Sequence, residues 1–332
     1  QLLLGCLLVL LIGGLVTVAD AQLNVSIPQL QQVLLDSLLK LDTLQANSSG
    51  SKLDKSPYWH GADALADTVR VTGIVLVKPR VLRYTLARYN IFIQDTLTGQ
   101  LWGGLNVLTN DTSAEAQSTL ITAVDSGDVV TIVGRVTEFA QGQNNSLTEM
   151  FAYSPGFFQS PQVISIGTTK PRPLPKEVTC DSFAVLTKPM PSRGEKYEGM
   201  YVVIRNVTVN SVDPITGRFT VVDTLGNQVR MYDGSGWYTL QGHKFTGSSG
   251  TRSDYTPPPV GTKLSYLRGV VLPQNRSGTA GDYTIMPMYP GPRERAGSTY
   301  PGDIGISKFA PQISNIKRSP SPPLSTDSVR VR

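Results

Sequence analysis

The chain has 332 residues, with 40% hydrophobic and 17% charged residues, 31 Gly and 23 Pro, a balance that leaves room for two ordinary domains of short strands and turns and argues against long helices. The formal net charge is +5, but residues 167–176 hold three basic residues without an acid, and residues 307–332 hold five basic residues against one acidic residue. The charge distribution therefore excludes a folded region with the general basicity of a strong phosphate binder, and any electrostatic site must be local.

The N-terminal segment is typical of a signal peptide. The apolar run "LLLGCLLVLLIGGLVTV" precedes "ADA", a small-x-small cleavage motif that ends at Ala21. We predict a signal peptide over residues 1–21, without its basic n-region, that is cleaved after Ala21; the alternative is an uncleaved membrane anchor. Cleavage predicts a secreted or cell-surface protein with no stable membrane insertion. Cys180 is then the one remaining cysteine, which excludes an intramolecular disulfide and favours a buried thiol.

The residues after the signal peptide predict a helical segment followed by a small β-barrel. Residues 22–57 form an N-terminal helical and loop segment, with an amphipathic stretch at 28–45. From Asp67 onward the apolar residues alternate with period two, as they do in half-buried strands. The predicted strands are 67–77, 90–95, 101–108, 126–139 and 146–151, with a helix at 112–124 that begins in a capping-box pattern. Five strands with a helix between the third and fourth are the element order of an OB-fold barrel.

The same order of strand patterns recurs later in the chain. The second set lies at 199–209, 218–223, 227–233, 259–271 and 282–287, and Asp223 stands in the place of Asp95. A repeat of this length indicates a duplicated domain. We predict an all-β fold of two tandem five-stranded OB-fold barrels with short helical segments only. The first barrel covers residues 58–167 and the second covers residues 178–306.

Three segments are predicted to lie outside the barrels or to loop from them. Residues 168–177 form a proline-rich linker between the two copies. Residues 233–258 are rich in glycine, serine and proline, which predicts a mobile loop in the second copy. Residues 307–332 are expected to be a linker and the start of a truncated β domain of immunoglobulin-like type.

The sequence contains no convincing catalytic constellation. His60 and His243 are far apart in different regions, and neither an HExxH zinc motif nor a GxSxG nucleophile elbow is present. Asp95 and Asp223 recur at matched positions, but each begins a turn, where aspartate caps the following amides. We therefore predict no enzyme activity, no catalytic residue, no metal site and no cofactor.

One local pattern points to nucleic acid. The stretch "VKPRVLRYTLARYN", residues 77–90, combines lysine and arginine with tyrosine and lacks acids, and such cations meet phosphates while the rings stack on bases. In the following strands, alternation directs Ile91 and Ile93 into the core and directs Phe92 and Trp102 outward. The candidate nucleic-acid-binding residues are Lys78, Arg80, Arg83, Tyr84, Arg88, Tyr89, Phe92 and Trp102.

A structural interpretation of the same residues stays open. A cation-rich loop is often only solvated, and an outward aromatic ring can pack under a neighbouring domain or under the N-terminal segment. The second copy has Thr220 in the place of Phe92 and lacks the cation cluster. The first barrel is therefore the predicted site if either barrel binds a single strand.

Four segments carry a resemblance to a known group of proteins. These are "KSPYWHGADALADTVRVTGIVLV", "IFIQD", "GDVVTIVGRVTEF" and "YEGMYVVIRNVTV". Over roughly residues 55–310 the chain resembles the tandem OB-fold modules of secreted, Bacteroidetes-type bacterial proteins. Such modules occur beside extracellular nucleases and in large exported proteins that continue into immunoglobulin-like domains. The resemblance implies export by a type nine secretion route.

These observations predict a secreted, non-enzymatic tandem OB-fold binding module, with the first barrel as the candidate site for single-stranded DNA or RNA. One alternative is a structural spacer, or a protein- or carbohydrate-binding module, of a large surface protein. Another alternative is an accessory part of an extracellular nuclease whose catalytic domain lies elsewhere. Other domains of the same full-length protein are expected partners besides nucleic acid.

Overall fold

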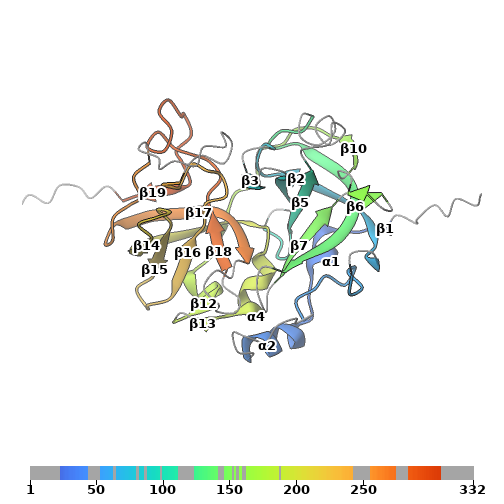
Figure 1. Ribbon diagram of the computed structural model, residues 1–332, viewed down its shortest axis with the longest axis horizontal. Coiled ribbons are helices and arrows are strands. Elements are labelled where there is room, and N and C mark those ends of the chain that lie inside the picture. Colours follow the sequence, from blue (N-terminus) through green and yellow to red (C-terminus); the bar gives the residue numbers. More distant parts are fainter. Residues whose placement is uncertain are drawn as a thin grey trace, which may run out of the picture.

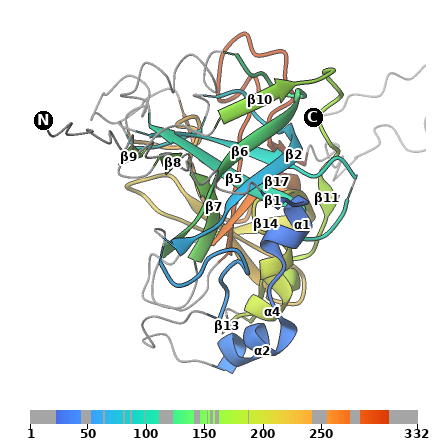
Figure 2. The ribbon, with the colours of Figure 1, turned by 90° about the vertical axis from the view of Figure 1, so that its right-hand side faces the viewer.

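A computed structural model gives the three-dimensional structure of the chain. It describes residues 23–43, 53–62, 65–79, 82–85, 88–97, 99–110, 123–140, 146–151, 153–154, 157–158, 162–186, 188–241, 255–273 and 283–307. The predicted signal peptide, most of the predicted 112–124 helix and the tail after Ser307 lie outside these ranges. Within them, two β-barrels lie side by side, with the short helices gathered along one edge of the pair (Figures 1 and 2).

The first barrel has the strand order of an OB fold. Its strands are β2 (Thr68–Val75), β4 (Arg88–Gln94), β5 (Gly104–Asn110), β6 (Val129–Ala140) and β7 (Ser146–Phe151). They neighbour one another in the order β2-β4-β5-β7-β6, and β6 pairs back with β2 to close the barrel. The β5–β7 pair is parallel, whereas the other pairs are antiparallel. The sequence prediction of a closed five-stranded barrel is confirmed.

The second barrel repeats this order. Its strands are β14 (Tyr201–Val212), β15 (Phe219–Val222), β16 (Gln228–Met231), β17 (Lys263–Pro273) and β18 (Tyr283–Met286). The order is β14-β15-β16-β18-β17, with β17 paired back to β14 and with β16–β18 as the parallel pair. Each barrel encloses a core of its own, because alternate residues of every strand point inward. Ile91 and Ile93 are inside, as alternation predicted.

Short strands extend or decorate both barrels. Around the first barrel, β1 (Leu23–Asn24) pairs with β2, β3 (Leu82–Thr85) pairs with β4, and β10 (Gln162–Ile166) pairs with β6. Around the second barrel, β11 (Lys176–Glu177) pairs with β14, and β19 (Ile304–Ile306) pairs with β17. Two small ribbons are separate: β8 (Tyr153–Ser154) with β9 (Phe157–Phe158), and β12 (Ala184–Val185) with β13 (Lys188–Pro189).

The helices are short and lie against the barrels. The amphipathic stretch forms α1 (Ile27–Gln31) and α2 (Leu35–Thr43), while α4 (Pro191–Gly194) and the 3-10 helices η3 (Cys180–Ser182) and η4 (Glu195–Tyr197) precede β14. Burial raises the pKa of the Cys180 thiol to about 12, as expected of a structural cysteine rather than a reactive one. Among the described residues, no helix is both long enough and apolar enough to cross a bilayer.

The predicted linker is tied to both barrels. The Lys170 amide donates to Gly127 O at 2.8 Å, and the Thr169 hydroxyl donates to Asp128 at 2.8 Å. The Arg172 guanidinium lies 4.8 Å from the ring centroid of Tyr201 in the second barrel. The segment 168–177 is therefore anchored by contacts to both barrels.

The excursion between β16 and β17 is packed at its two described ends, 233–241 and 255–258, where the prediction of a mobile loop is wrong; for the residues between them it stays a prediction. Tyr238 is fully buried, and Tyr255 is buried with its ring 6.2 Å from that of Tyr238. Asp233 holds the turn that starts the excursion, because its carboxylate accepts hydrogen bonds from the Ser235 and Gly236 amides. Residues 242–254 lie outside the described part of the chain.

The two barrels share an apolar interface. Phe92 and Leu147 of the first barrel pack against Tyr201 and Leu272 of the second. The Tyr201 amide donates to Gln94 Oε1 at 3.0 Å, across the junction. At its closest point the backbone of Gly104 touches that of Gly199, and a Cβ on Gly104 would overlap the Gly199 carbonyl carbon. This close approach requires glycine.

Four partly or fully buried carboxylates gather beside this interface, where residues 53–62, β6 and η4 meet: Asp54, Glu138, Glu195 and Glu198. Burial raises the pKa of Glu138 to about 7. Burial also raises the pKa of Glu198 well above its usual value, and the negative charge of Glu195 adds to this rise. Glu198 Oε1 accepts from the Thr148 amide at 2.9 Å, while Oε2 has no hydrogen-bond partner in the part of the chain that is described. No group of three or more His, Cys, Asp or Glu among the described residues is arranged to hold a metal ion.

This carboxylate cluster predicts a loss of stability as the pH rises. An acid whose pKa is raised on folding binds more protons in the folded state, so its stabilising effect is complete below the usual pKa of 4.5 and disappears as the pH rises through the folded value, about 7 for Glu138. Each such proton changes the free energy of unfolding by about 1.4 kcal/mol per pH unit in that window. We expect Glu198→Gln, a neutral isostere, to be less pH-dependent than the wild type and more stable at pH 8.

Urea unfolding at pH 5, 6, 7 and 8 measures this difference. Glu177→Gln is the matched control, because the Glu177 side chain is 69% exposed and its charge is solvated. An unchanged pH dependence in Glu198→Gln would contradict the prediction.

Candidate nucleic-acid interface

OB folds present ligands on the outer face of their second and third strands. In the first barrel these strands are β4 and β5, and in the second barrel they are β15 and β16. The register aligns Phe92 of β4 with Asn106 of β5 and Glu149 of β7. In the second barrel the corresponding row is Thr220, Arg230 and Thr284. The two rows show what each barrel offers at its ligand face.

The ligand face of the first barrel is closed. Phe92 and Asn106 are both 0% exposed, because the second barrel covers the face. Asn106 donates to Glu149 Oε1 at 2.9 Å and accepts from Asn90 Nδ2 at 3.2 Å. These hydrogen bonds pair buried polar groups of Asn90, Asn106 and Glu149 with one another within the protein. The outer face of β4 and β5 is therefore closed to a ligand.

Phe92 is therefore not a stacking platform, and this part of the sequence prediction is wrong. Alternation did direct the ring away from the barrel core. The ring nevertheless lies in the apolar interface with Tyr201, Met286 and Leu272. An outward position on an isolated barrel becomes an inward position once another barrel packs on it.

Trp102 lies elsewhere, in the turn between β4 and β5. Its ring is half-buried and packs on the small cluster of Val33, Leu38 and Leu41 under the N-terminal helices. Its amide donates to Lys196 O at 2.8 Å. The structure thus separates Trp102 from Phe92, and the two rings form no common surface.

The basic stretch 77–90 is partly a β-hairpin rather than a loop, because Leu82–Thr85 forms β3 and pairs with β4. The Lys78 ammonium is exposed and lies 3.0 Å from Asp125 Oδ2, so its charge is locally compensated. Arg80 lies outside the described residues. The same holds for the side chains of four other candidates, although their backbone follows β3 and β4: Arg83, Tyr84, Arg88 and Tyr89. Their role in binding stays a prediction.

The ligand face of the second barrel carries an open cavity of about 250 Å³. The residues that line it are Ser211, Asp213, Arg218, Phe219, Thr220, Arg230, Met231, Tyr232 and Thr284. The Arg218 guanidinium lies 4.4 Å from the centroid of the Tyr232 ring, a cation–π contact. Arg230 stands directly across the strand pair from Thr220. Two guanidinium groups, an aromatic ring and hydroxyl groups therefore meet on the face that the fold uses for ligands.

Asp213 is the one acid among the described residues that line this cavity, and it forms hydrogen bonds within a turn. Its Oδ1 accepts from the Ile215 amide at 2.8 Å, and its Oδ2 accepts from the Thr216 hydroxyl at 2.6 Å. The hydrogen bond from Thr216 lowers the pKa of the Asp213 carboxyl. The positive charge of Arg218 lowers this pKa as well, so the carboxylate both holds the turn before β15 and partly compensates the charge of Arg218.

The sequence pattern did not single out Arg218 and Arg230, because the two residues are not part of a cluster of cations along the chain. The two residues are separated by a turn and come together only through the β15–β16 register. A signal did exist: Arg218 and Thr220, like Arg230 and Tyr232, have the two-residue spacing of side chains on one face of a strand.

Comparisons with known proteins give no information on function beyond this geometry. No protein-family model and no curated protein matches the chain. Among solved structures, the chain is similar to a deletion mutant of the single-stranded DNA-binding protein from Thermus aquaticus, at 12% sequence identity and a TM-score of 0.18. The match covers 65% of this chain and 88% of that chain. A superposition this poor transfers no function, and the OB topology rests on the strand pairings above.

The closed face predicts a large effect of a substitution at Phe92. Because the ring is buried between the barrels, we expect Phe92→Ala to lower the free energy of unfolding by about 3–5 kcal/mol. Phe139 lies on the same barrel with its residue 48% exposed, so Phe139→Ala is the matched control and should cost below about 1 kcal/mol. Urea unfolding at constant pH measures both. Equal, small effects of the two substitutions would show that the ring is not buried in the folded protein.

Proposed function

We propose that this chain is a non-enzymatic tandem OB-fold binding module that takes single-stranded nucleic acid on the β15–β16 face of its second barrel. The observation that carries the proposal is the contrast between two equivalent faces. Phe92 and Asn106 on the first are sealed, whereas the cavity on the second is lined by Arg218 and Arg230. The first barrel then serves as a support for the second.

The chemistry of this cavity suits a single strand. A planar guanidinium binds phosphate through paired N–H donors. Arg218, stacked on Tyr232, also offers a flat surface on which a base can lie. The hydroxyls of Ser211 and Thr220 are near enough to line the same cavity. Because two cations among the described residues line the cavity, binding is expected to be weak, with a modest salt dependence of about 0.7 in the slope of log K against log salt for each phosphate contact.

The proposal retains two expectations from the sequence. Secretion rests on the apolar run and the cleavage motif at Ala21. The non-enzymatic role rests on a sequence without an HExxH or GxSxG motif. An assay for hydrolysis of DNA or RNA with added divalent metal tests the second expectation.

A second candidate function is a rigid spacer within a larger surface protein. It is favoured by the apolar interface around Phe92 and Tyr201, together with the linker contact of Arg172. Barrels joined in this way hold a fixed distance between flanking domains. This function requires no ligand, so it predicts that the arginines of the β15–β16 face are dispensable.

Fluorescence anisotropy with fluorescein-labelled single-stranded DNA, at low and at physiological salt, tests the nucleic-acid proposal. We expect Arg218→Ala/Arg230→Ala to weaken binding at least tenfold at low salt, because two phosphate contacts are lost. The slope of log K against log salt concentration should fall by about 1.4, at roughly 0.7 for each contact. Arg193→Ala/Arg205→Ala is the matched control: both residues are exposed, each is paired with a carboxylate, and neither lines the cavity.

A triple variant, Arg80→Ala/Arg83→Ala/Arg88→Ala, separates the two barrels. If it loses binding while Arg218→Ala/Arg230→Ala binds normally, the site is the β3–β4 hairpin and the proposed face is wrong. If the wild type binds no DNA or RNA even at low salt, the nucleic-acid function is wrong and the spacer function is preferred.

A further inference from the structure

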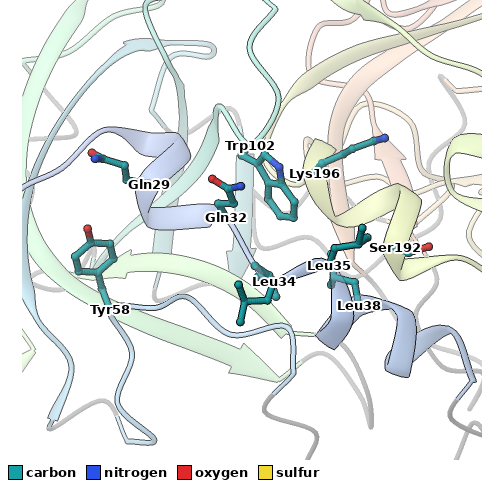
Figure 3. A pocket seen from close by; sticks show the side chains of 10 residues that line it. Gln29, Gln32, Leu34, Leu35, Leu38, Tyr58, Trp102, Ser192 and Lys196 are labelled. Atoms are coloured by element: carbon teal, nitrogen blue, oxygen red, sulfur yellow. The ribbon is translucent and has the colours of Figure 1, made fainter.

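A second cavity lies on the same edge of the molecule as the helices, away from the β15–β16 face. It has a volume of about 610 Å³, within the range of small-molecule sites, which are found preferentially between domains. The residues that line it are Gln29, Gln32, Val33, Leu34, Leu35, Leu38, Tyr58, Trp102, Ser192 and Lys196 (Figure 3). They come from α1, α2 and the residues between them, from the 53–62 segment, from the β4–β5 turn, and from α4 and η4 of the second barrel. We name this cavity the junction cleft.

Docking of the second barrel completes the junction cleft. The Ser192 amide, at the start of α4, donates to Asp42 Oδ1 of α2 at 2.9 Å, and Figures 1 and 2 both show α4 beside α2. The Trp102 amide donates to Lys196 O. The walls are therefore fixed relative to one another by hydrogen bonds between segments far apart in the chain.

Trp102 is held at this cleft at an energetic cost. Its φ is 65°, a left-handed conformation that is unfavourable for a bulky residue. Strained conformations persist where the surrounding structure enforces them, and they concentrate at ligand sites. Here the bond to Lys196 O fixes the backbone, and the indole lies between Gln32 and the Lys196 stem (Figure 3). The strain thus presents an aromatic face to the cavity.

The polar groups of the cleft are mostly uncharged. Among the described residues, no acid lines it, and the one cation that does, Lys196, directs its ammonium away from the indole (Figure 3) toward the Tyr197 ring, 5.4 Å from the centroid. The Gln29 side chain is committed to capping α1, since its Oε1 accepts from the Ser26 amide at 2.9 Å. Gln32, Ser192 and Tyr58 are the uncharged donors and acceptors that line the remaining wall.

This arrangement selects among ligand classes. A phosphorylated or carboxylated ligand would find no cation directed at it, and a cationic ligand would find no carboxylate. A peptide that binds by strand addition needs a free strand edge, but the residues of the walls lie in helices, in a turn and in the segments beside them. A ring with one apolar face and hydroxyl groups at its rim matches an indole, uncharged hydrogen-bonding groups and the exposed side chains of Leu34 (77%) and Leu35 (59%).

We propose that the junction cleft binds a neutral pyranose of a glycan, with the sugar ring stacked on Trp102 and its hydroxyls bonded to Gln32 and Ser192. The site is independent of the nucleic-acid face, and neither proposal requires the other. The site would add a second ligand class, a neutral sugar, to the module. The first barrel contributes Trp102 of its β4–β5 turn to this site, whereas its β4–β5 face is covered by the second barrel.

Saturation-transfer NMR and calorimetry on the full chain test this site with cellobiose and N,N′-diacetylchitobiose as neutral probes and digalacturonate as the charged comparator. We expect at least one neutral disaccharide to bind, and Trp102→Ala to raise its Kd at least tenfold. Trp102→Phe keeps a ring and should retain part of the affinity. Trp237→Phe, in the second barrel and outside the cleft, is the matched control and should bind as the wild type does.

Gln32→Ala provides a variant whose folding is not in question, because Gln32 is exposed. It should raise the Kd of the neutral probe at least threefold while the thermal melting curve stays unchanged. Binding of the acidic comparator alone, binding that survives Trp102→Ala, or no binding of any probe at millimolar concentration would each overturn the proposal.

Discussion

The packing of the second barrel onto the β4–β5 face of the first is the interaction on which the other features depend. It buries Phe92 completely and pairs Gln94 with the Tyr201 backbone. It also brings Gly104 and Gly199 into backbone contact, where no other residue fits. Apolar burial supplies the driving force, while the hydrogen bond and the glycine contact set the orientation of the barrels.

The cost of this packing is visible in the acids beside it. Glu198 and Glu195 are removed from water, and burial raises the pKa of both carboxyls. Because a buried, unpaired charge is expensive, burial favours the neutral forms, whereas the hydrogen bond that the Tyr283 hydroxyl donates to Glu195 lowers the pKa of that carboxyl and offsets part of the rise. The packing of the barrels is therefore coupled to the protonation of Glu195 and Glu198. At neutral pH the apolar contacts of the interface must outweigh the free-energy cost of burying these carboxyls.

The two barrels share a topology but differ in which outer face is covered. On the first, the row at Phe92 is interior to the protein, and on the second, the row at Arg230 faces a cavity. The packing of the two barrels thus leaves the β15–β16 face uncovered at its cavity and forms a cleft where the N-terminal helices, the Trp102 turn and α4 meet. A site built between domains in this way can bind chemistry that neither barrel binds alone.

The sequence by itself determined the strands, the duplication and the inward residues such as Ile91 and Ile93, because period-two alternation is a local property of each strand. The burial of Cys180 also followed from composition. Only the tertiary structure decided which outward residues stay outside. Phe92 is covered by residues more than a hundred positions away, Trp102 turns toward a cleft, and Arg218 and Arg230 meet across a register. These placements depend on how the two folded barrels pack on each other, and no local sequence pattern specifies the contact between the barrels.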